Sequence, residues 1–404
     1  MHLLLIHQAF ASLDEAGGTR HYEMARFLVS RGHQVTIIAS PVSYLTGKSQ
    51  NDKVRWLERE QPEEGITILR VFTYSALHKS FFHRLVSFFS FMISSFLVGL
   101  SVKQVDLVWS TSPPIFQGVT AWLIARIKGV RFLFEVRDLW PAFAVAAGVL
   151  RNRLLIWLSE GLERFLYRHA DRVMVNSPGF IEHVSSHGAR WVELVPNGAD
   201  PSMFDLHQNG LHIRQQWGLN DEFVVLYAGA HGLSNDLEVV LDSAWILRDE
   251  GQIRFVLVGD GKEKTHLIHR AQEMGLTNVL FIPPVAKKEM GEILSAADAC
   301  LAILKPLEWY RTTYPNKVFD YMAAGKPVVL AIDGVIREVI ETHNAGVAVP
   351  PGDSQALAQV IRNLAADPQK AREMGLAGRK AVESCYNRQR FSIRLAEIIE
   401  EMRF

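Results

Sequence analysis

The sequence of 404 residues has little cysteine and no net charge. Its two cysteines, Cys300 and Cys385, lie far apart and outside any metal-ligand spacing. We therefore expect neither a disulfide framework nor a zinc site. Lysine plus arginine and aspartate plus glutamate both total 43, so no overall charge attracts nucleic acid. A reducing, cytoplasmic setting without a nucleic-acid partner is the expectation.

Several phosphate-binding motifs are also missing. No full G-x-G-x-x-G follows the first expected strand, which argues against a nicotinamide dehydrogenase. Neither G-x-x-x-x-G-K-[ST] nor D-x-D occurs. The amino terminus, "MHLLLIHQAF", lacks the basic region and the long apolar run of a signal peptide. It is expected to form a buried first strand.

What the sequence does contain is an alternation of short apolar runs and helical stretches. The runs are "HLLLIH", "QVTIIA", "DLVWST", "FLFEV", "RVMVN", "FVVLYAG", "RFVLVGDG", "VLFIP" and "KPVVLAI". This pattern predicts an α/β fold with parallel sheets covered by helices on both faces. A Pro/Gly/Asn/Asp-rich passage over 197–204 separates two sets of about five or six strands. We expect Rossmann-like domains over 1–198 and 199–385 with a cleft between them, and a last helix, 386–404, able to pack back onto the first domain.

One segment of the first domain carries no charge, between Arg84 and Lys103. It only just reaches the lower length limit for a membrane span. One helical face holds Ser87, Ser90, Ser94 and Ser101, and the opposite face holds Phe88, Phe89, Met92 and Phe96. Basic residues, including Lys79, precede it. Three interpretations stay open: contact with an anionic membrane surface through 79–103, an ordinary buried helix, or a true span.

Two pairs of residues in the first domain are candidates for ligand binding. Gly17 and Gly18 precede an expected helix, where free N–H groups and the lack of a Cβ suit a close-lying anion. The alternative is a plain tight turn. Arg137 and Asp138 end the strand "FLFEV", at the sheet edge where such folds bind ligands. They either face a reacting ligand or brace the loop as an ion pair.

In the second domain, two strands run into glycine-containing loops and then helices. Gly229 and Gly232 follow one strand, and Gly259 and Gly261 follow the next. Their small size would let the backbone approach a nucleotide. His231, in the first of these loops, is a candidate donor to phosphate, with a merely solvated histidine as the alternative.

The stretch "RTTYPNKVFDYMAAGKPVV" places Lys317 near the start of an expected helix and Asp320 one turn later. Asn316 is predicted as the N-cap and Gly325 as the helix stop. Lys317 and Asp320 share a helical face, yet lysine before aspartate is the less favourable order for a surface pair. A ligand with phosphate at Lys317 and hydroxyls at Asp320 explains the arrangement better, and a nucleoside diphosphate has that layout.

Taken together and in this order, these stretches resemble a known family. The segments are "GG…RGHQV", "VRDLWP", "VPNGAD…F", "YAG", "VGDGKEK" and "PNKVFDYMAAGKPVV…IETHNAGVAVPPGD". They are similar to family 4 retaining glycosyltransferases of the GT-B fold, in the branch for bacterial cell-surface polysaccharides. The resemblance implies two doubly wound Rossmann-like domains, a nucleotide-sugar donor held mainly by the second domain, an acceptor held mainly by the first, and neither a metal nor a cofactor.

The resemblance also implies roles for residues around the donor. Family members carry two acidic residues eight positions apart, the second gripping the ribose and the first the donor sugar. Asp320 stands at the second position, and Thr312 replaces the first acid. The contact to the sugar is then expected from Glu308 or from the backbone of "RTTYPN", which includes Asn316.

Two further positions depart from the family pattern. The loop "AGAHGLSNDLE" lacks the arginine and lysine that neutralise the leaving diphosphate. Lys317, helped by His231 and helix N-termini, is expected to stabilise that charge instead. Arg137 stands where many relatives carry a histidine, and its permanent charge suits positioning or binding of an acceptor phosphate, beside Asp138.

The leading hypothesis from the resemblance is a hexosyltransferase. It would move a sugar from UDP to a lipid-linked saccharide in O-antigen, capsule or exopolysaccharide synthesis, at the inner face of the cytoplasmic membrane. Two alternatives stay open: a nucleotide-sugar epimerase of the same architecture, and a non-catalytic nucleotide-sugar-binding subunit.

Overall fold

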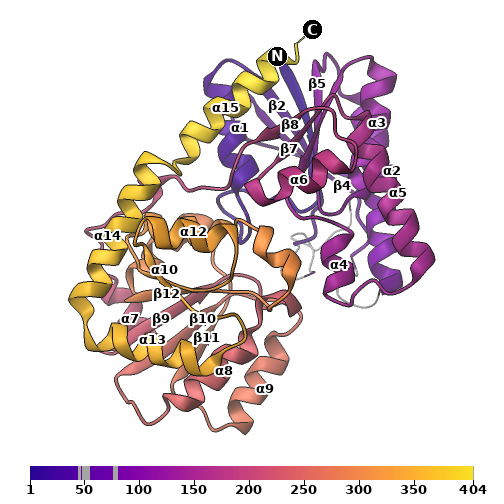
Figure 1. Cartoon of the computed structure of the whole chain (residues 1–404). Helices are drawn as coiled ribbons and strands as arrows, with labels where there is room; N and C mark the ends of the chain where they lie inside the picture. The colour runs from indigo at the N-terminus through magenta and orange to yellow at the C-terminus, as the bar shows by residue number, and fades with distance from the viewer. Residues whose placement is uncertain (44–46, 48–54, 76–80, 404) are drawn as a thin grey trace. The chain divides into compact units, whose positions relative to one another are not determined.

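The computed structural model describes residues 1–43, 47, 55–75 and 81–403. Lys79, predicted at the start of a membrane-facing segment, lies outside the described residues. Contacts divide the chain into two compact units (Figure 1). Unit 1 comprises residues 1–12, 18–196 and 389–404, and unit 2 comprises residues 13–17 and 197–388.

Unit 1 is built on a mostly parallel sheet. Within the described ranges it has eight strands in the order β3-β4-β2-β1-β5-β6-β7-β8, and only the β3/β4 pair is antiparallel. The strands are β1 (His2–Ile6), β2 (Gln34–Ala39), β3 (Leu57–Glu63), β4 (Ile66–Val71), β5 (Leu107–Ser112), β6 (Arg131–Val136), β7 (Arg172–Val175) and β8 (Val192–Leu194). The central strands are almost continuously buried, as expected where helices cover both faces of a sheet.

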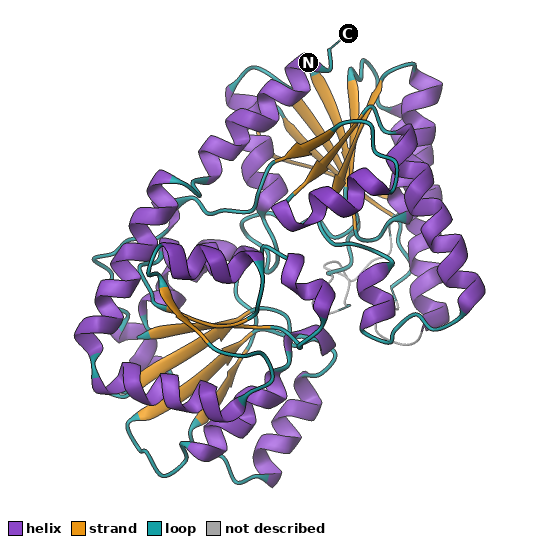
Figure 2. Ribbon diagram, in the orientation of Figure 1, coloured by secondary structure: helices purple, strands orange, loops and turns teal. Residues whose placement is uncertain are grey.

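Helices cover this sheet (Figure 2). They are α1 (Arg20–Ser30), α2 (Phe81–Ser101), α3 (Phe116–Lys128), α4 (Ala142–Ala146), α5 (Arg153–His169), the 3-10 helix η1 (Pro178–Phe180), α6 (Ile181–Ser186) and α15 (Arg388–Glu401). Local signals set their ends: the side chain of Asn152 caps α5, and Gly129 closes α3 in the left-handed conformation, at φ +68°.

Unit 2 holds a fully parallel sheet in the order β11-β10-β9-β12-β13-β14. Its strands are β9 (Phe223–Ala228), β10 (Ile253–Val258), β11 (Val279–Ile282), β12 (Ala299–Ile303), β13 (Val328–Ala331) and β14 (Gly346–Ala348). Its α-helices are α7 (Leu211–Gln216), α8 (Leu237–Ile246), α9 (Lys264–Glu273), α10 (Met290–Ser295), α11 (Asn316–Ala323), α12 (Val335–Thr342), α13 (Ser354–Ala366) and α14 (Pro368–Ser384). Short 3-10 helices are η2 (Pro201–Met203), η3 (Leu233–Asn235), η4 (Lys287–Glu289) and η5 (Glu308–Thr312).

The predicted fold class is confirmed, since each unit is a Rossmann-like α/β layer structure. In unit 2 the connection reverses direction between β9 and β12, and in unit 1 between β1 and β5. Ligands of doubly wound sheets bind beyond the carboxyl ends of the strands at such switch points. The candidate functional residues of each unit are therefore expected at this edge of its sheet.

Helix α2 exposes several of its large apolar side chains. Ser87, Ser94 and Ser95 are fully buried, and Ser94 donates to the Phe72 carbonyl (2.7 Å). The exposed face instead carries large apolar side chains: Phe82, Phe89, Ile93 and Leu97. Over Phe82–Ser101 the helix is long and apolar enough to cross a membrane, and one third (33%) of that window is buried. Of the serines predicted to share one face, Ser87 and Ser94 are thus buried and Ser90 is half-buried, whereas Ser101 is exposed.

Candidate functional site

The switch point of unit 2 gathers two glycine loops and the start of α11. The β9 loop begins at Gly229, where a Cβ would lie 2.6 Å from Lys317 Nζ. Lys317 is the second residue of α11, and its Nζ lies 3.9 Å from the centre of the Tyr227 ring, at the end of β9. The predicted residues Gly229 and Lys317 therefore lie side by side.

The ammonium group of Lys317 is the most unusual feature of this site. Nζ is buried, and no hydrogen-bond acceptor reaches it in the described part of the chain. Nζ lies against the face of the Tyr227 ring, which attracts a cation but does not replace a counter-ion. Burial lowers the pKa of Lys317 to about 7. Such a group gains stability from an arriving anion.

His231 is buried as well, which overturns its alternative interpretation as a solvated loop residue. Its side chain is fully buried, and neither ring nitrogen has a hydrogen-bond partner among the described residues. Burial, followed by the charges of Lys264 and Lys317, lowers the pKa of His231 to about 4. At neutral pH the ring is uncharged and retains one N–H that can donate to a ligand.

The glycines of the β10 loop are required by a close approach of two loops that the sequence does not reveal. A Cβ on Gly259 would lie 1.9 Å from the Gly229 carbonyl oxygen, and a Cβ on Gly261 would lie 2.4 Å from the His231 carbonyl oxygen. Both glycines also have positive φ, +147° and +156°. They let the β10 loop pack against the β9 loop, whereas a Cβ on Gly232 would meet only the side chain of Asn235, at 3.6 Å.

The prediction that Asn316 is the N-cap of α11 is wrong. Pro315 occupies that position, and α11 begins without a side-chain cap. Asn316 Oδ1 instead accepts from Arg388 Nη2 (2.6 Å), and Arg388 is buried and also donates to the Gly198 carbonyl. The stop at Gly325 is confirmed, since it follows the Ala324 C-cap with φ +67°.

Asp320 has a charged partner that the sequence did not suggest. Its Oδ2 lies 2.6 Å from Nζ of Lys287, and the two side chains are only 13% and 6% exposed. The alternative of a surface pair with Lys317 is therefore wrong. The predicted contact of Asp320 with a ribose stays a prediction. Lys287 is the functional candidate that sequence reasoning missed, because no periodicity links two residues 33 positions apart.

Two residues expected at or near the contact to the donor sugar, in place of the first acidic residue of the family pattern, lie on η5. Glu308 is 83% exposed in its side chain and lies 3.4 Å from Arg311, one turn along η5. The Thr312 hydroxyl donates to the Trp309 carbonyl (2.7 Å). Their predicted role toward the donor sugar remains a prediction.

In unit 1, Arg137 and Asp138 lie just beyond the carboxyl end of β6. No ion pair joins them in the described residues, so the bracing interpretation is wrong. Arg137 Nε donates to the Thr111 hydroxyl (2.8 Å), and its Nη2 donates to the Pro113 carbonyl (3.4 Å). Burial raises the pKa of Asp138 to about 6, although the positive charge of Arg137 acts to lower it.

A buried ionic cluster of unit 1 was not predicted. Glu135, in the buried strand β6, pairs with Arg20 Nε (3.1 Å) and His21 Nε2 (2.5 Å) of α1. Burial alone would raise the pKa of Glu135, but His21, Arg20 and Arg137 outweigh it and hold that pKa at about 2. A glutamate inside an apolar strand was the signal that could have revealed it.

His7, at the end of β1, lies against this cluster, with its ring centre 4.3 Å from that of His21. Burial lowers the pKa of both histidines. Of the two predicted glycines at this level, Gly17 belongs by contacts to unit 2 and has φ +150°, and Gly18 belongs to unit 1. A Cβ on Gly18 would meet nothing within 4 Å.

Two family models match the two halves of the chain. The model described as "Glycosyl transferase 4-like domain" matches residues 16–198, and the one described as "Glycosyl transferases group 1" matches residues 211–381. Together they span nearly all of both units.

Relatives and solved structures agree with these matches. The chain is 27% identical over 356 residues to WcaI of Escherichia coli (strain K12), named as a colanic acid biosynthesis glycosyl transferase, covering 84% of this chain and 86% of WcaI. Among solved structures it resembles a sucrose-phosphate synthase from Thermosynechococcus elongatus (TM-score 0.79, 20% identity, covering 99% and 98%). It also resembles Anabaena Alr3699/HepE in complex with UDP and glucose (TM-score 0.74, 18% identity, covering 99% and 100%). These likenesses establish the GT-B fold.

Proposed function

Because its two halves match both domains of these enzymes, the chain belongs to the GT-B glycosyltransferases of family 4, and we propose that it is a retaining hexosyltransferase. The proposed donor is a UDP-sugar, and the proposed acceptor is a lipid-linked saccharide in cell-surface polysaccharide synthesis. The complex of Alr3699/HepE with UDP and the colanic acid assignment of WcaI support the donor and the process.

The observation that carries the proposal is the unsatisfied cation at the switch point of unit 2. Buried polar atoms without a partner are rare and call for an explanation. Lys317 Nζ and both ring nitrogens of His231 are three such atoms within one unit, and all stand near the carboxyl ends of strands. A diphosphate would supply the acceptors they lack. The uncapped start of α11 adds further N–H donors for an anion.

The proposed chemistry makes use of this arrangement. The bond from C1 of the donor sugar to the β-phosphate oxygen breaks, and C1 forms a new bond to the acceptor oxygen on the same face. The acceptor proton passes to the departing diphosphate, so no carboxylate nucleophile is required. Lys317 and the neutral His231 would stabilise the charge that develops on that diphosphate, normally the largest catalytic contribution. The transfer itself is proposed to need neither cofactor nor metal.

The exposed face of α2 supports a membrane-bound acceptor. Phe82 and Ile93 are 70% and 61% exposed, whereas Ser87, Ser94 and Ser95 are buried. Trp157, on α5 of the same unit, is 67% exposed, and α3 packs against both α2 and α5. We infer peripheral attachment to the cytoplasmic face of an anionic membrane.

Liposome sedimentation tests the attachment. Wild type is expected to sediment with vesicles of anionic phospholipid, and Phe89→Ser with Ile93→Ser is expected to shift the protein to the supernatant. Ser87→Ala, on the buried face of α2, serves as the control for a change that leaves the exposed face intact. Wild type that stays in solution with such vesicles would refute the attachment.

Turnover with a panel of nucleotide sugars tests the function. The purified enzyme is expected to release UDP from one UDP-sugar only when a membrane extract supplies the acceptor. Below the melting temperature of the protein, excess EDTA should not prevent this release. Epimerised sugar without acceptor would instead establish the epimerase. Tight nucleotide binding without any turnover would establish a binding subunit.

A further inference from the structure

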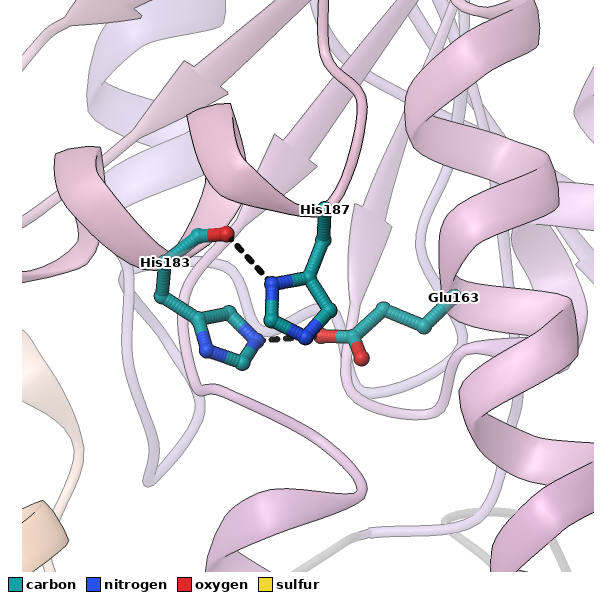
Figure 3. A group of neighbouring side chains, drawn as sticks. All are labelled: Glu163, His183 and His187. Atoms are coloured by element: carbon teal, nitrogen blue, oxygen red, sulfur yellow. Dashed lines mark hydrogen bonds and ion pairs between the residues drawn. The ribbon is translucent and has the colours of Figure 1, made fainter.

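A second group of ligating side chains lies in unit 1, between α5 and the end of α6. Glu163 belongs to α5, His183 to α6, and His187 is the residue that caps α6 at its carboxyl end. One ligand atom of each lies within 4.8 Å of the other two. Figure 3 shows the three side chains converging from two helices.

The imidazole of His187 is held by a backbone hydrogen bond and stacks on the ring of His183, with ring centres 3.9 Å apart. Its Nδ1 donates to the carbonyl of His183 (2.7 Å), which fixes the proton on that nitrogen. The other nitrogen, Nε2, therefore carries a lone pair, and it points toward the carboxylate of Glu163 (Figure 3). A backbone carbonyl that orients one ring nitrogen while the other binds metal is a common arrangement around metal ions.

Glu163 supplies the negative charge. Its side chain is only 2% exposed, and its Oε1 accepts from the Tyr167 hydroxyl (2.9 Å) and from His183 Nε2 (2.9 Å). Tyr167 orients the carboxylate from behind. A metal ion would take the place of the proton shared by His183 and Glu163, and that proton would leave to solvent.

We propose that Glu163, His183 and His187 bind a zinc ion that fastens α6 to α5. Two imidazoles favour zinc over calcium or magnesium, which prefer oxygen ligands. Three protein ligands leave a fourth position for water. The six-residue helix α6 is too short to be stable alone, so a metal clip would hold the β7–α6–β8 connection. None of the three residues belongs to the proposed donor site. The cysteine count alone predicts no zinc site, because it ignores histidines and a glutamate brought together by folding.

Zinc binding by the tag-free full chain tests this proposal. After removal of metal with EDTA, ZnCl2 is titrated in a calorimeter, and Co²⁺ is added separately to record the visible absorption of a tetrahedral site. The wild type is expected to bind one Zn²⁺, and a hundredfold excess over Kd should raise the melting temperature by roughly 5–10 °C.

His187→Asn is the test variant, because His187 is partly exposed and its loss leaves the His183–Glu163 hydrogen bond in place. It is expected to lose zinc binding at least tenfold and to lose the stabilisation by zinc, with the metal-free melting temperature nearly unchanged. His266→Asn is the matched control, since His266 also bonds a glutamate, Glu238 (2.8 Å), but has no third ligand beside it among the described residues. Undiminished zinc affinity in His187→Asn, or no binding by wild type, would overturn the proposal.

Discussion

The two units place charged side chains at equivalent edges of their sheets, yet they satisfy them differently. In unit 1 the buried carboxylate of Glu135 receives Arg20 and His21, so the cluster contains its own counter-charges. In unit 2 the buried ammonium of Lys317 lies over an aromatic face and has no anionic partner among the described residues. The carboxylate of Glu135 thus has its partners within the folded chain, although Nδ1 of His21 and both ring nitrogens of the neighbouring His7 lack hydrogen-bond partners among the described residues. For Lys317, the proposed ligand would supply the missing anion.

The difference separates two roles that burial alone does not distinguish. Glu135 has its pKa held low, which means that folding and ionisation support one another. Lys317 has its pKa lowered by burial, which means that folding disfavours its charge. Removing Glu135 should therefore damage stability, and removing Lys317 should damage function.

The largest expected effect is that of Glu135→Gln. It leaves the Arg20 guanidinium buried without its carboxylate, and breaking a buried ionic cluster in this way costs about 3–5 kcal/mol. Chemical denaturation followed by circular dichroism measures this loss. Glu160→Gln, which removes an exposed pair with Arg164, is the control and should change stability by less than about 0.5 kcal/mol. Equal losses of unfolding free energy in both variants would show that the buried ionic cluster of unit 1 does not stabilise the fold more than an exposed ion pair does.

Lys317→Met should reverse this pattern. Turnover is expected to fall roughly 10²–10³-fold, as for the loss of one strong stabiliser of a leaving-group charge, and the affinity for UDP should fall as well. The melting temperature should not decrease, because an unpaired buried charge is removed. Lys262→Met, at an exposed lysine after β10, should leave turnover unchanged. A loss of turnover below threefold in Lys317→Met would contradict the assignment.

The pair of Asp320 and Lys287 lies between these extremes, because it is nearly buried and near the proposed donor site. Asp320→Asn and Lys287→Met should each cost about 2 kcal/mol, and the double variant should cost less than their sum. Denaturant unfolding of all four proteins gives the coupling energy. Purely additive losses would show that the two side chains act independently.

The smallest expected effect is on the pH dependence of donor binding. Lys317 is charged below its pKa of about 7 and loses its proton above it, so the affinity for UDP should fall as pH rises from 7 to 8, by about fivefold. The titration of Lys317 also changes the stability of the fold. Between pH 7 and the ordinary lysine pKa, the unfolded chain binds more protons than the folded chain, so the free energy of unfolding rises with pH. Calorimetry of UDP binding across this range, with Lys317→Met as the flat reference, checks the first statement.

The sequence predicted the main elements because their signals are local. Apolar runs indicated β1, β9 and β10, and Gly325 indicated the end of α11. The strand β12, "ACLAI", was missed because its alanine-rich pattern suits a helix as well as a strand. The edge strand β3 was missed as well, since its charged sequence contains no apolar run. The strand β4 was also missed, although its sequence "ITILRV" is largely apolar.

The site was less predictable because its contacts join distant segments. The sequence indicated Lys317 and His231, but not that both are buried without partners among the described residues. Lys287 and Arg388 cannot be found from spacing, since each reaches α11 only through the folded chain. The serines of α2 showed an amphipathic helix, but hydropathy alone assigned no direction to its two faces.

The most direct test of the central claim is the titration of the Lys317 ammonium itself, followed by NMR of chains with isotope-labelled lysine and assigned with Lys317→Met. In the free protein its pKa should lie far below that of the other lysines, near 7. Saturation with UDP should raise that pKa, because the diphosphate favours the charged form. A pKa of Lys317 that stays unchanged when UDP is bound would contradict the account.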